Sequence, residues 1–218
     1  MTFFYCAQIN RIEATDDEWA EQLTEVFEES GLLGTELLPE VPRGLVNLNY
    51  DIHVCVHMGT EIRPEESAYP PTAISFPFEE NSSNEKLHTL ILIDADLNNK
   101  VHWMVVNIPG AKVHKGKVVS AYAGPNPAQG TGTHRYMVLV MEQNSGLIND
   151  QFVTDFKSET SCDTLEITNF DFAAFRNTLN LSKPVAANYF TQTFDPFVEN
   201  LNGHCLRQTP INPHPLYK

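Results

Sequence analysis

The chain has 218 residues, 42% of them hydrophobic, and a formal net charge of −14. These values are typical of one globular domain with a short addition, and they exclude a mainly disordered chain. They also argue against nucleic acid as a partner, because so acidic a protein offers no positive surface to phosphate backbones. No run of about 18 apolar residues predicts a membrane span, and residues 1–14 lack the basic and apolar regions of a secretory signal.

The acidity is concentrated near the N-terminus. Residues 13–40 hold ten of the 28 acidic residues and none of the 14 basic ones, so the rest of the chain has 18 acids, 14 bases and a charge of −4. Residues 15–30 have the spacing of an amphipathic helix, with Thr15 and Glu18 as a capping box and Gly31 as its end. Its apolar face is formed by Trp19, Leu23, Val26 and Phe27. We expect this helix to pack on the edge of the domain with its acids in solvent.

The hydrophobic pattern changes to the two-residue period of β-strands after residue 42. Predicted strands cover residues 45–50, 52–58, 73–76, 87–94, 101–108, 136–142 and 186–194. The fourth, fifth and sixth of these are apolar almost throughout, which is typical of strands buried on both faces of a sheet.

Helical spacing returns over residues 170–179, where Thr168 or Asn169 is predicted as the cap, and a short helix is predicted to open at Asp195-Pro196 and end at Gly203. Most strands therefore precede most helices instead of alternating with them. This order favours a mainly β protein, a β-sandwich of two antiparallel or mixed sheets with C-terminal helices and an extra N-terminal helix.

Four cysteines are scattered along the chain without a CxxC motif: Cys6, Cys55, Cys162 and Cys205. At this length, such spacing favours neither a disulfide framework nor a zinc finger. We therefore expect reduced thiols in a cytosolic protein.

Polar residues gather at the ends of the apolar strands. Asp94 and Asp96 follow one strand, His102 lies just inside the next, and His134 follows a Gly-Thr-Gly loop. If the flanking strands pair, the Asp94 carboxylate reaches the His102 imidazole and sets its tautomer. Two imidazoles beside the N–H groups of a glycine loop form a cradle for an anion. Each feature also has a purely structural explanation, since strand histidines are usually core groups and Asp94 can cap a turn.

Other chemistries find less support in the sequence. The GxSxG pattern of a hydrolase is absent, no cysteine lies in a nucleophile motif, and Asp94, His102 and His134 lack the spacing of a metal site. We therefore predict a protein that is not an enzyme and that uses no metal and no cofactor.

Residues 37–202 resemble the phosphatidylethanolamine-binding protein family. The resemblance is carried most clearly by LHTLILIDAD, VHWMVVNIPG and GPNPAQGTGTHRYMVLVMEQ, in which a GTGxHRY run precedes an apolar strand. It implies a β-sandwich with a small, solvent-accessible pocket for phosphate or phosphoryl head groups. The implied pocket residues are Asp94, His102, His134 and Tyr136, with Asn126 and Pro127 on the rim.

The chain departs from the family pattern around this implied pocket. The family's DPDAP-like motif is DADLN at residues 94–98, Val101 replaces a second histidine, and Asn126 holds a rim position often occupied by glycine. The wall of the pocket is therefore predicted to differ from that of other members.

The resemblance implies a binding protein for a phosphate-bearing small molecule or a phospholipid head group. It further implies a cytoplasmic signalling regulator or scaffold with a protein partner, for example a kinase. Two alternatives are a structural subunit of a large assembly, such as the mitochondrial large ribosomal subunit, and a serine protease inhibitor. The implied organisation is an acidic helical extension over residues 1–36, the family domain over 37–202 and a proline-rich tail over 203–218.

Overall fold

The computed structural model describes residues 16–51, 53–78, 86–149, 151–152 and 169–196. Its elements in chain order are α1 (Asp16–Glu29), β1 (Gly44–Leu45), β2 (Asn47–Asp51), β3 (Val54–Val56), β4 (Thr60–Glu61), β5 (Ala73–Ser75), β6 (Leu87–Asp94), β7 (Lys100–Pro109), the 3-10 helix η1 (Val113–Lys115), β8 (Lys117–Ser120), β9 (His134–Glu142), α3 (Phe172–Thr178) and β10 (Ala186–Gln192). The predicted cap Thr15, the predicted helix beyond Pro196 and the predicted tail lie outside the described residues. No helix among the described residues has the length and apolar character that a bilayer span requires.

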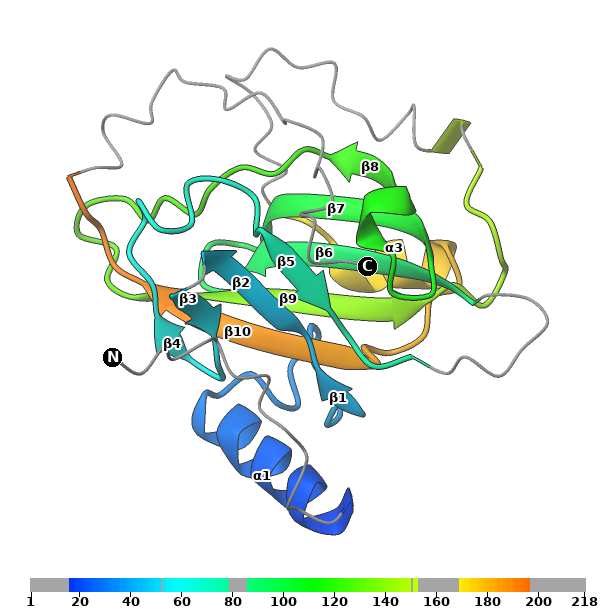
Figure 1. Ribbon diagram of the computed structural model, residues 1–218, viewed down its shortest axis with the longest axis horizontal. Coiled ribbons are helices and arrows are strands. Elements are labelled where there is room, and N and C mark those ends of the chain that lie inside the picture. The colour runs from blue at the N-terminus through cyan, green and yellow to red at the C-terminus, as the bar shows by residue number, and fades with distance from the viewer. Residues whose placement is uncertain (1–15, 52, 79–85, 150, 153–168, 197–218) are drawn as a thin grey trace.

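The strands form two sheets, and the predicted mainly β sandwich is confirmed. The larger sheet has seven strands in the order β1-β10-β9-β6-β7-β8, with β4 also paired to β10, and the smaller has the order β3-β2-β5. Strand β10 pairs in parallel with β1 and β4, whereas the other pairings are antiparallel. Figure 1 shows the smaller sheet lying across one face of the larger.

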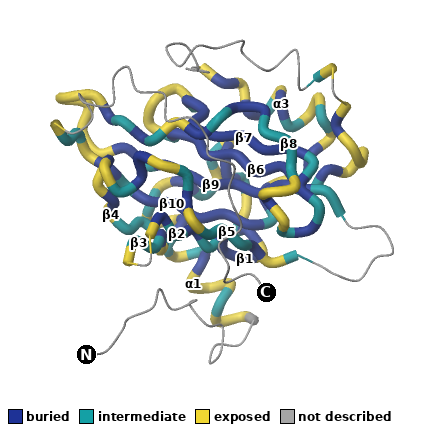
Figure 2. Tube along the Cα trace, turned by 45° about the horizontal axis from the view of Figure 1, so that its top comes forward, coloured by how far each residue is buried: buried dark blue, intermediate teal, exposed yellow. Residues whose placement is uncertain are grey.

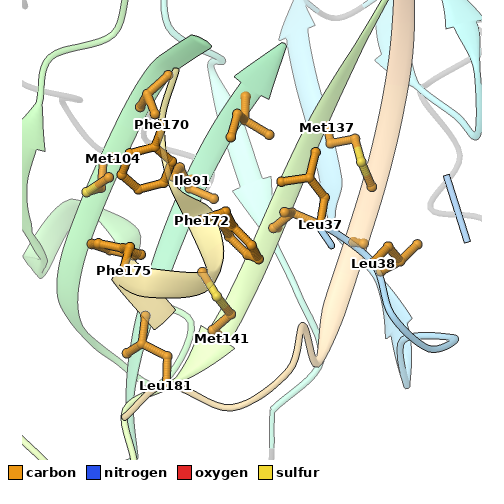
Figure 3. Packing of buried hydrophobic residues seen from close by; sticks show 14 of the residues in the cluster. Leu37, Leu38, Ile91, Met104, Met137, Met141, Phe170, Phe172, Phe175 and Leu181 are labelled. Atoms are coloured by element: carbon orange, nitrogen blue, oxygen red, sulfur yellow. The ribbon is translucent and has the colours of Figure 1, made fainter. Parts of the chain in front are cut away.

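Each face of the larger sheet has its own apolar core, which explains why β6, β7 and β9 are apolar almost throughout. One core lies between the larger sheet and the helices, and Figure 3 shows Phe172 and Phe175 of α3 packed toward Ile91 and Met104. The other core lies between the two sheets and includes Leu48, Tyr136 and Phe190. The central strands are accordingly buried along nearly their whole length (Figure 2).

Helix α1 contributes to the core instead of resting on its edge. Leu23 and Phe27 are 1% and 0% exposed, and the Phe27 ring centroid lies 6.0 Å from that of Tyr189 on β10. The helix ends as predicted, because Gly31 has a φ of 66° and the N–H of Leu32 donates to the carbonyl of Phe27. The predicted boundary at residue 36 stays a prediction, but α1 shares the apolar core of the larger sheet.

Helix α3 begins later than predicted. Its cap is Asp171, whose carboxylate accepts from the N–H of Ala174, so the prediction of Thr168 or Asn169 is wrong. Asn169 has a φ of 56°, and the chain adopts helical geometry only from Phe172 onward. Periodicity alone did not reveal this, because the buried Phe170 continues the apolar spacing ahead of the true cap.

Cys55 on β3 is disulfide-bonded, so the prediction of reduced thiols is wrong at this position. The other three cysteines lie outside the described residues. Disulfide pairing depends on which strands and loops fold back on one another, and spacing along the chain does not contain that information.

His88 on β6 gives stability a dependence on pH. It is 1% exposed, and burial lowers the pKa of His88, which the charge of Glu142 offsets only in part. The His88 imidazole therefore binds a proton more readily in the unfolded chain than in the folded protein. The stability that neutral His88 contributes is present above the ordinary histidine pKa of about 6.5, and it is lost as the pH falls through the lowered pKa of the folded state. We expect the loss of unfolding free energy between about pH 7.5 and about pH 5 to be smaller in His88→Gln than in the parent protein.

Urea denaturation at both pH values measures this difference. His114→Gln removes an exposed histidine and should retain the full pH dependence. An identical pH dependence in His88→Gln and the parent protein would contradict the assignment.

Candidate functional site

Strands β6 and β9 bring three of the predicted site residues to one end of the larger sheet. Asp94 is the last residue of β6, and His134 is the first of β9. Asp94 pairs directly with Tyr136 in the antiparallel register. Directly paired residues project from the same face, and Tyr136 belongs to the core that faces the smaller sheet.

A β-bulge places His102 on that same face. Leu92 of β6 pairs with Trp103, whereas the next residue of β6 pairs with Val101, so the register shifts around His102. Val101 lies in the core beneath the helices, and Trp103 lies in the core between the sheets. The His102 ring meets Tyr136 edge-on with 5.3 Å between centroids. The extra residue of the bulge has therefore re-aimed the imidazole toward the other site residues.

The Asp94 carboxylate lies at the centre of this cluster. It is 1% exposed and accepts two hydrogen bonds, from Nδ1 of His134 at 2.7 Å and from the N–H of Asp96 at 2.9 Å, while the Tyr136 phenol lies beside it in the strand pairing. Burial raises the pKa of Tyr136, and the negative charge of Asp94 raises it further. The Tyr136 hydroxyl therefore keeps its proton and remains a donor.

His134, and not His102, is thus the histidine that Asp94 orients, and the predicted Asp94–His102 contact is replaced by another. Nδ1 of His102 donates to the carbonyl of Ala123 at 3.0 Å, and the N–H of Ala123 donates back to the carbonyl of His102 at 2.7 Å. Because a carbonyl only accepts, Nδ1 carries a proton, and Nε2 becomes a donor only when the ring is doubly protonated.

The hydrogen bonds around His134 suit its imidazolium form. Nε2 lies 2.8 Å from Oγ1 of Thr131, whose hydroxyl donates to the carbonyl of Ala128 at 2.8 Å. With that proton already used, Thr131 accepts from Nε2, while Nδ1 donates to Asp94. Both ring nitrogens of His134 are therefore engaged, Nδ1 by the buried carboxylate of Asp94 and Nε2 by Thr131.

The predicted rim residues lie on the loop between β8 and β9. Pro127 is buried and Asn126 is half-buried. The loop meets the cluster at Ala123, whereas Asn126 and Pro127 form no hydrogen bond to the cluster within the described part of the chain. The same loop packs closely against the segment between β4 and β5. A Cβ on Gly124 would lie only 3.0 Å from Cα of Ala68, so the close approach requires glycine.

Three further polar residues lie beside the cluster, and the sequence analysis missed them. Gln192 of β10 pairs with His134, and its Nε2 donates to Oγ of Ser67 at 2.6 Å. The carbonyl of Ser67 accepts from the hydroxyl of Tyr122 at 2.6 Å. No signal in the sequence marked Gln192, because only the strand pairing places it opposite His134.

Asp96 and Arg135 lie on the opposite face, which Asp96 reaches because β6 ends at Asp94 and a turn follows. Nε of Arg135 donates to Asp96 at 2.9 Å and Nη2 at 2.5 Å. Burial alone would raise the pKa of Asp96, but the hydrogen bonds and charge of Arg135 outweigh it and lower that pKa. Nη1 of Arg135 also donates to the carbonyl of Ser30 at 2.6 Å, just after α1. This pair therefore ties the end of α1 to the strands that carry the cluster.

Comparisons with known proteins identify relatives of this chain. Residues 55–190 match the phosphatidylethanolamine-binding protein family. The chain is 30% identical over 174 residues to the putative odorant-binding protein A5 of Drosophila melanogaster, covering 76% of this chain and 78% of that protein. It is also 30% identical over 176 residues to a 26 kDa secreted antigen of Toxocara canis, covering 73% of this chain and 62% of the antigen.

Solved structures share the fold. The solution structure of CG7054 is 30% identical, with a TM-score of 0.57, and the match covers 77% of this chain and 94% of that one. Carboxypeptidase Y inhibitor, solved with its cognate proteinase, has a TM-score of 0.66 at 18% identity, and the match covers 84% of this chain and 99% of the inhibitor. The length of the family match and the level of identity lead to one conclusion: the chain belongs to the phosphatidylethanolamine-binding protein family.

Proposed function

We propose that the chain is a non-enzymatic binding protein that takes a small phosphate-bearing ligand at the cluster of Asp94, His102, His134 and Tyr136. The observation that carries this proposal is a buried carboxylate bound to His134, with the rings of both His102 and His134 gathered around Tyr136. Membership of a family named for binding a phospholipid supports it, as does a relative named for odorant binding.

The cluster holds the chemistry that an anion needs. Asp94 keeps His134 in a donor form and orients the ring, so that a phosphate oxygen can take the position that Thr131 occupies on Nε2. The four side chains are at most 3% exposed, so a ligand reaches them only when the exposed loop over residues 128–133 moves aside. His102 becomes a second donor on protonation, and binding should therefore strengthen as the pH falls.

A titration with inorganic phosphate, followed by NMR of the histidine side chains at about pH 6 and about pH 8, tests the proposal. We expect resonances of His102 and His134 to shift, with tighter binding at the lower pH. His102→Ala should weaken binding by about 1–3 kcal/mol, the usual contribution of a hydrogen bond to a charged group. His114→Ala, which removes an exposed histidine on η1, should bind phosphate like the parent protein.

The absence of any shift at His102 and His134 would refute the proposal. Equal affinity at the two pH values would refute the role given to the protonated imidazoles.

The finer roles implied by the family resemblance stay predictions. A kinase or another protein partner, a place in the mitochondrial large ribosomal subunit and inhibition of a serine protease are each compatible with the family. The carboxypeptidase Y inhibitor is only 18% identical, so its likeness supports the fold and not an inhibitory role.

A further inference from the structure

Gln192 presents a buried hydrogen-bond acceptor to the cluster. The residue is 0% exposed, and within the described part of the chain its Oε1 has no hydrogen-bond partner. A buried acceptor without a donor costs about 1–3 kcal/mol, so such an atom in a binding site is expected to meet a donor on the ligand.

The amide is held in one orientation. Its Nε2 donates to Oγ of Ser67 at 2.6 Å, and Ser67 is itself 0% exposed and anchored through its carbonyl to Tyr122. In the strand register Gln192 lies directly opposite His134, so both side chains leave the same face of the sheet. Gln192 is therefore anchored by Nε2 on the face of the sheet that carries the imidazole we assign to the anion, and Oε1 is its unpaired end.

The Asp94 carboxylate of the cluster already accepts from Nδ1 of His134 and from the N–H of Asp96. Oε1 of Gln192, by contrast, is an acceptor without a partner among the described residues. A ligand that carries its own proton would therefore find an unpaired acceptor at Gln192.

Whether a ligand carries an O–H proton separates the classes of oxyanion that this site could bind. Inorganic phosphate keeps an O–H at neutral pH, and a phosphate monoester keeps one below a pH of about 6. Sulfate has the same shape and carries no proton, and a phosphodiester such as an intact phospholipid head group has none to donate. A site with a fixed buried acceptor favours the protonated species, because the others leave that acceptor unpaired.

Building on the anion site of the proposed function, we propose that Gln192 is a specificity-determining residue whose Oε1 accepts the O–H of a protonated phosphate. The site accordingly selects inorganic phosphate or a phosphate monoester over sulfate and over phosphodiesters.

Isothermal titration of the full chain at about pH 6 with inorganic phosphate, methyl phosphate, sulfate and dimethyl phosphate tests the inference. We expect phosphate to bind about 10-fold to 100-fold more tightly than sulfate, although sulfate carries the greater charge. Methyl phosphate should resemble phosphate, and dimethyl phosphate should resemble sulfate. An affinity for methyl phosphate well above that for phosphate would identify a monoester, and not free phosphate, as the source of the group.

Gln192→Met removes the acceptor at similar volume, and the ratio of phosphate to sulfate affinity should fall to within about 3-fold. Gln22→Met, the same change at an exposed position of α1, should keep the ratio of the parent protein. Histidine NMR spectra of each variant establish that the cluster has kept its fold.

The outcomes separate the two proposals. If no anion binds the parent protein, the proposed function fails. If phosphate and sulfate bind equally, or if Gln192→Met keeps the preference, anion binding stands and the role of Gln192 is overturned.

Discussion

Replacing Asp94 by alanine will lower the free energy of unfolding by about 3–5 kcal/mol and remove phosphate binding at the cluster. The carboxylate is 1% exposed and accepts from Nδ1 of His134 and from the N–H of Asp96. Without it, the buried His134 imidazole loses its partner, and the fall in stability reflects that loss more than the worth of any single bond. Urea denaturation followed by circular dichroism measures the change.

Asp17→Ala provides the control, because it removes an aspartate from the exposed side of α1. It should change the free energy of unfolding by less than about 0.5 kcal/mol. If Asp94→Ala lowered the free energy of unfolding by less than about 1 kcal/mol, the carboxylate would not be what stabilises the cluster.

Replacing Cys55 by serine will lower the free energy of unfolding by about 4–5 kcal/mol. Cys55 is disulfide-bonded, and a bond to any of the other three cysteines closes a loop of about 50 residues or more. Loops of that length strongly restrict the unfolded chain, which is the main source of the stability that a disulfide adds in the chain-entropy description. Thermal denaturation of the two proteins without reductant measures the difference.

His53→Ser, at an exposed position two residues away, should leave the stability within about 0.5 kcal/mol of the parent value. Labelling of the native protein with a thiol reagent should leave Cys55 unmodified until a reductant is added. A Cys55 thiol that reacts without reductant would show that the bond is absent.

The same bond bears on where the protein acts. Disulfides persist in oxidising compartments and are rare in the cytosol. We therefore propose an oxidising compartment in place of the cytoplasm that the sequence analysis predicted. Thiol labelling of protein taken from its native source decides between the two, since a cytosolic protein would present Cys55 as a thiol.

Local patterning in the sequence was sufficient for much of the fold. The apolar run over residues 87–94 is β6 to the residue, and the run over 101–108 is β7 with one residue added at each end. The amphipathic spacing before Gly31 is α1. These elements are readable because side-chain periodicity reports which faces of a strand or helix are buried. The short β8 (Lys117–Ser120) has too few residues to show a period, and it was not predicted.

The tertiary structure decided how the site is connected. Motif residues identified Asp94, His102, His134 and Tyr136, and these side chains do converge. Which histidine Asp94 binds depended on the register of β6 against β9 and on the bulge in β7. A shift of one residue turns every side chain of a strand to the other face, and no local pattern reports that register.

The sequence by itself therefore determined the strands, the first helix and the identity of the polar residues, because these follow from neighbours along the chain. The partners of Asp94, the place of Gln192 beside His134 and the cross-linked state of Cys55 were decided only in the folded molecule. Each of these contacts joins segments that are distant in sequence, and only the packing of two sheets and a helix into one core brings them together.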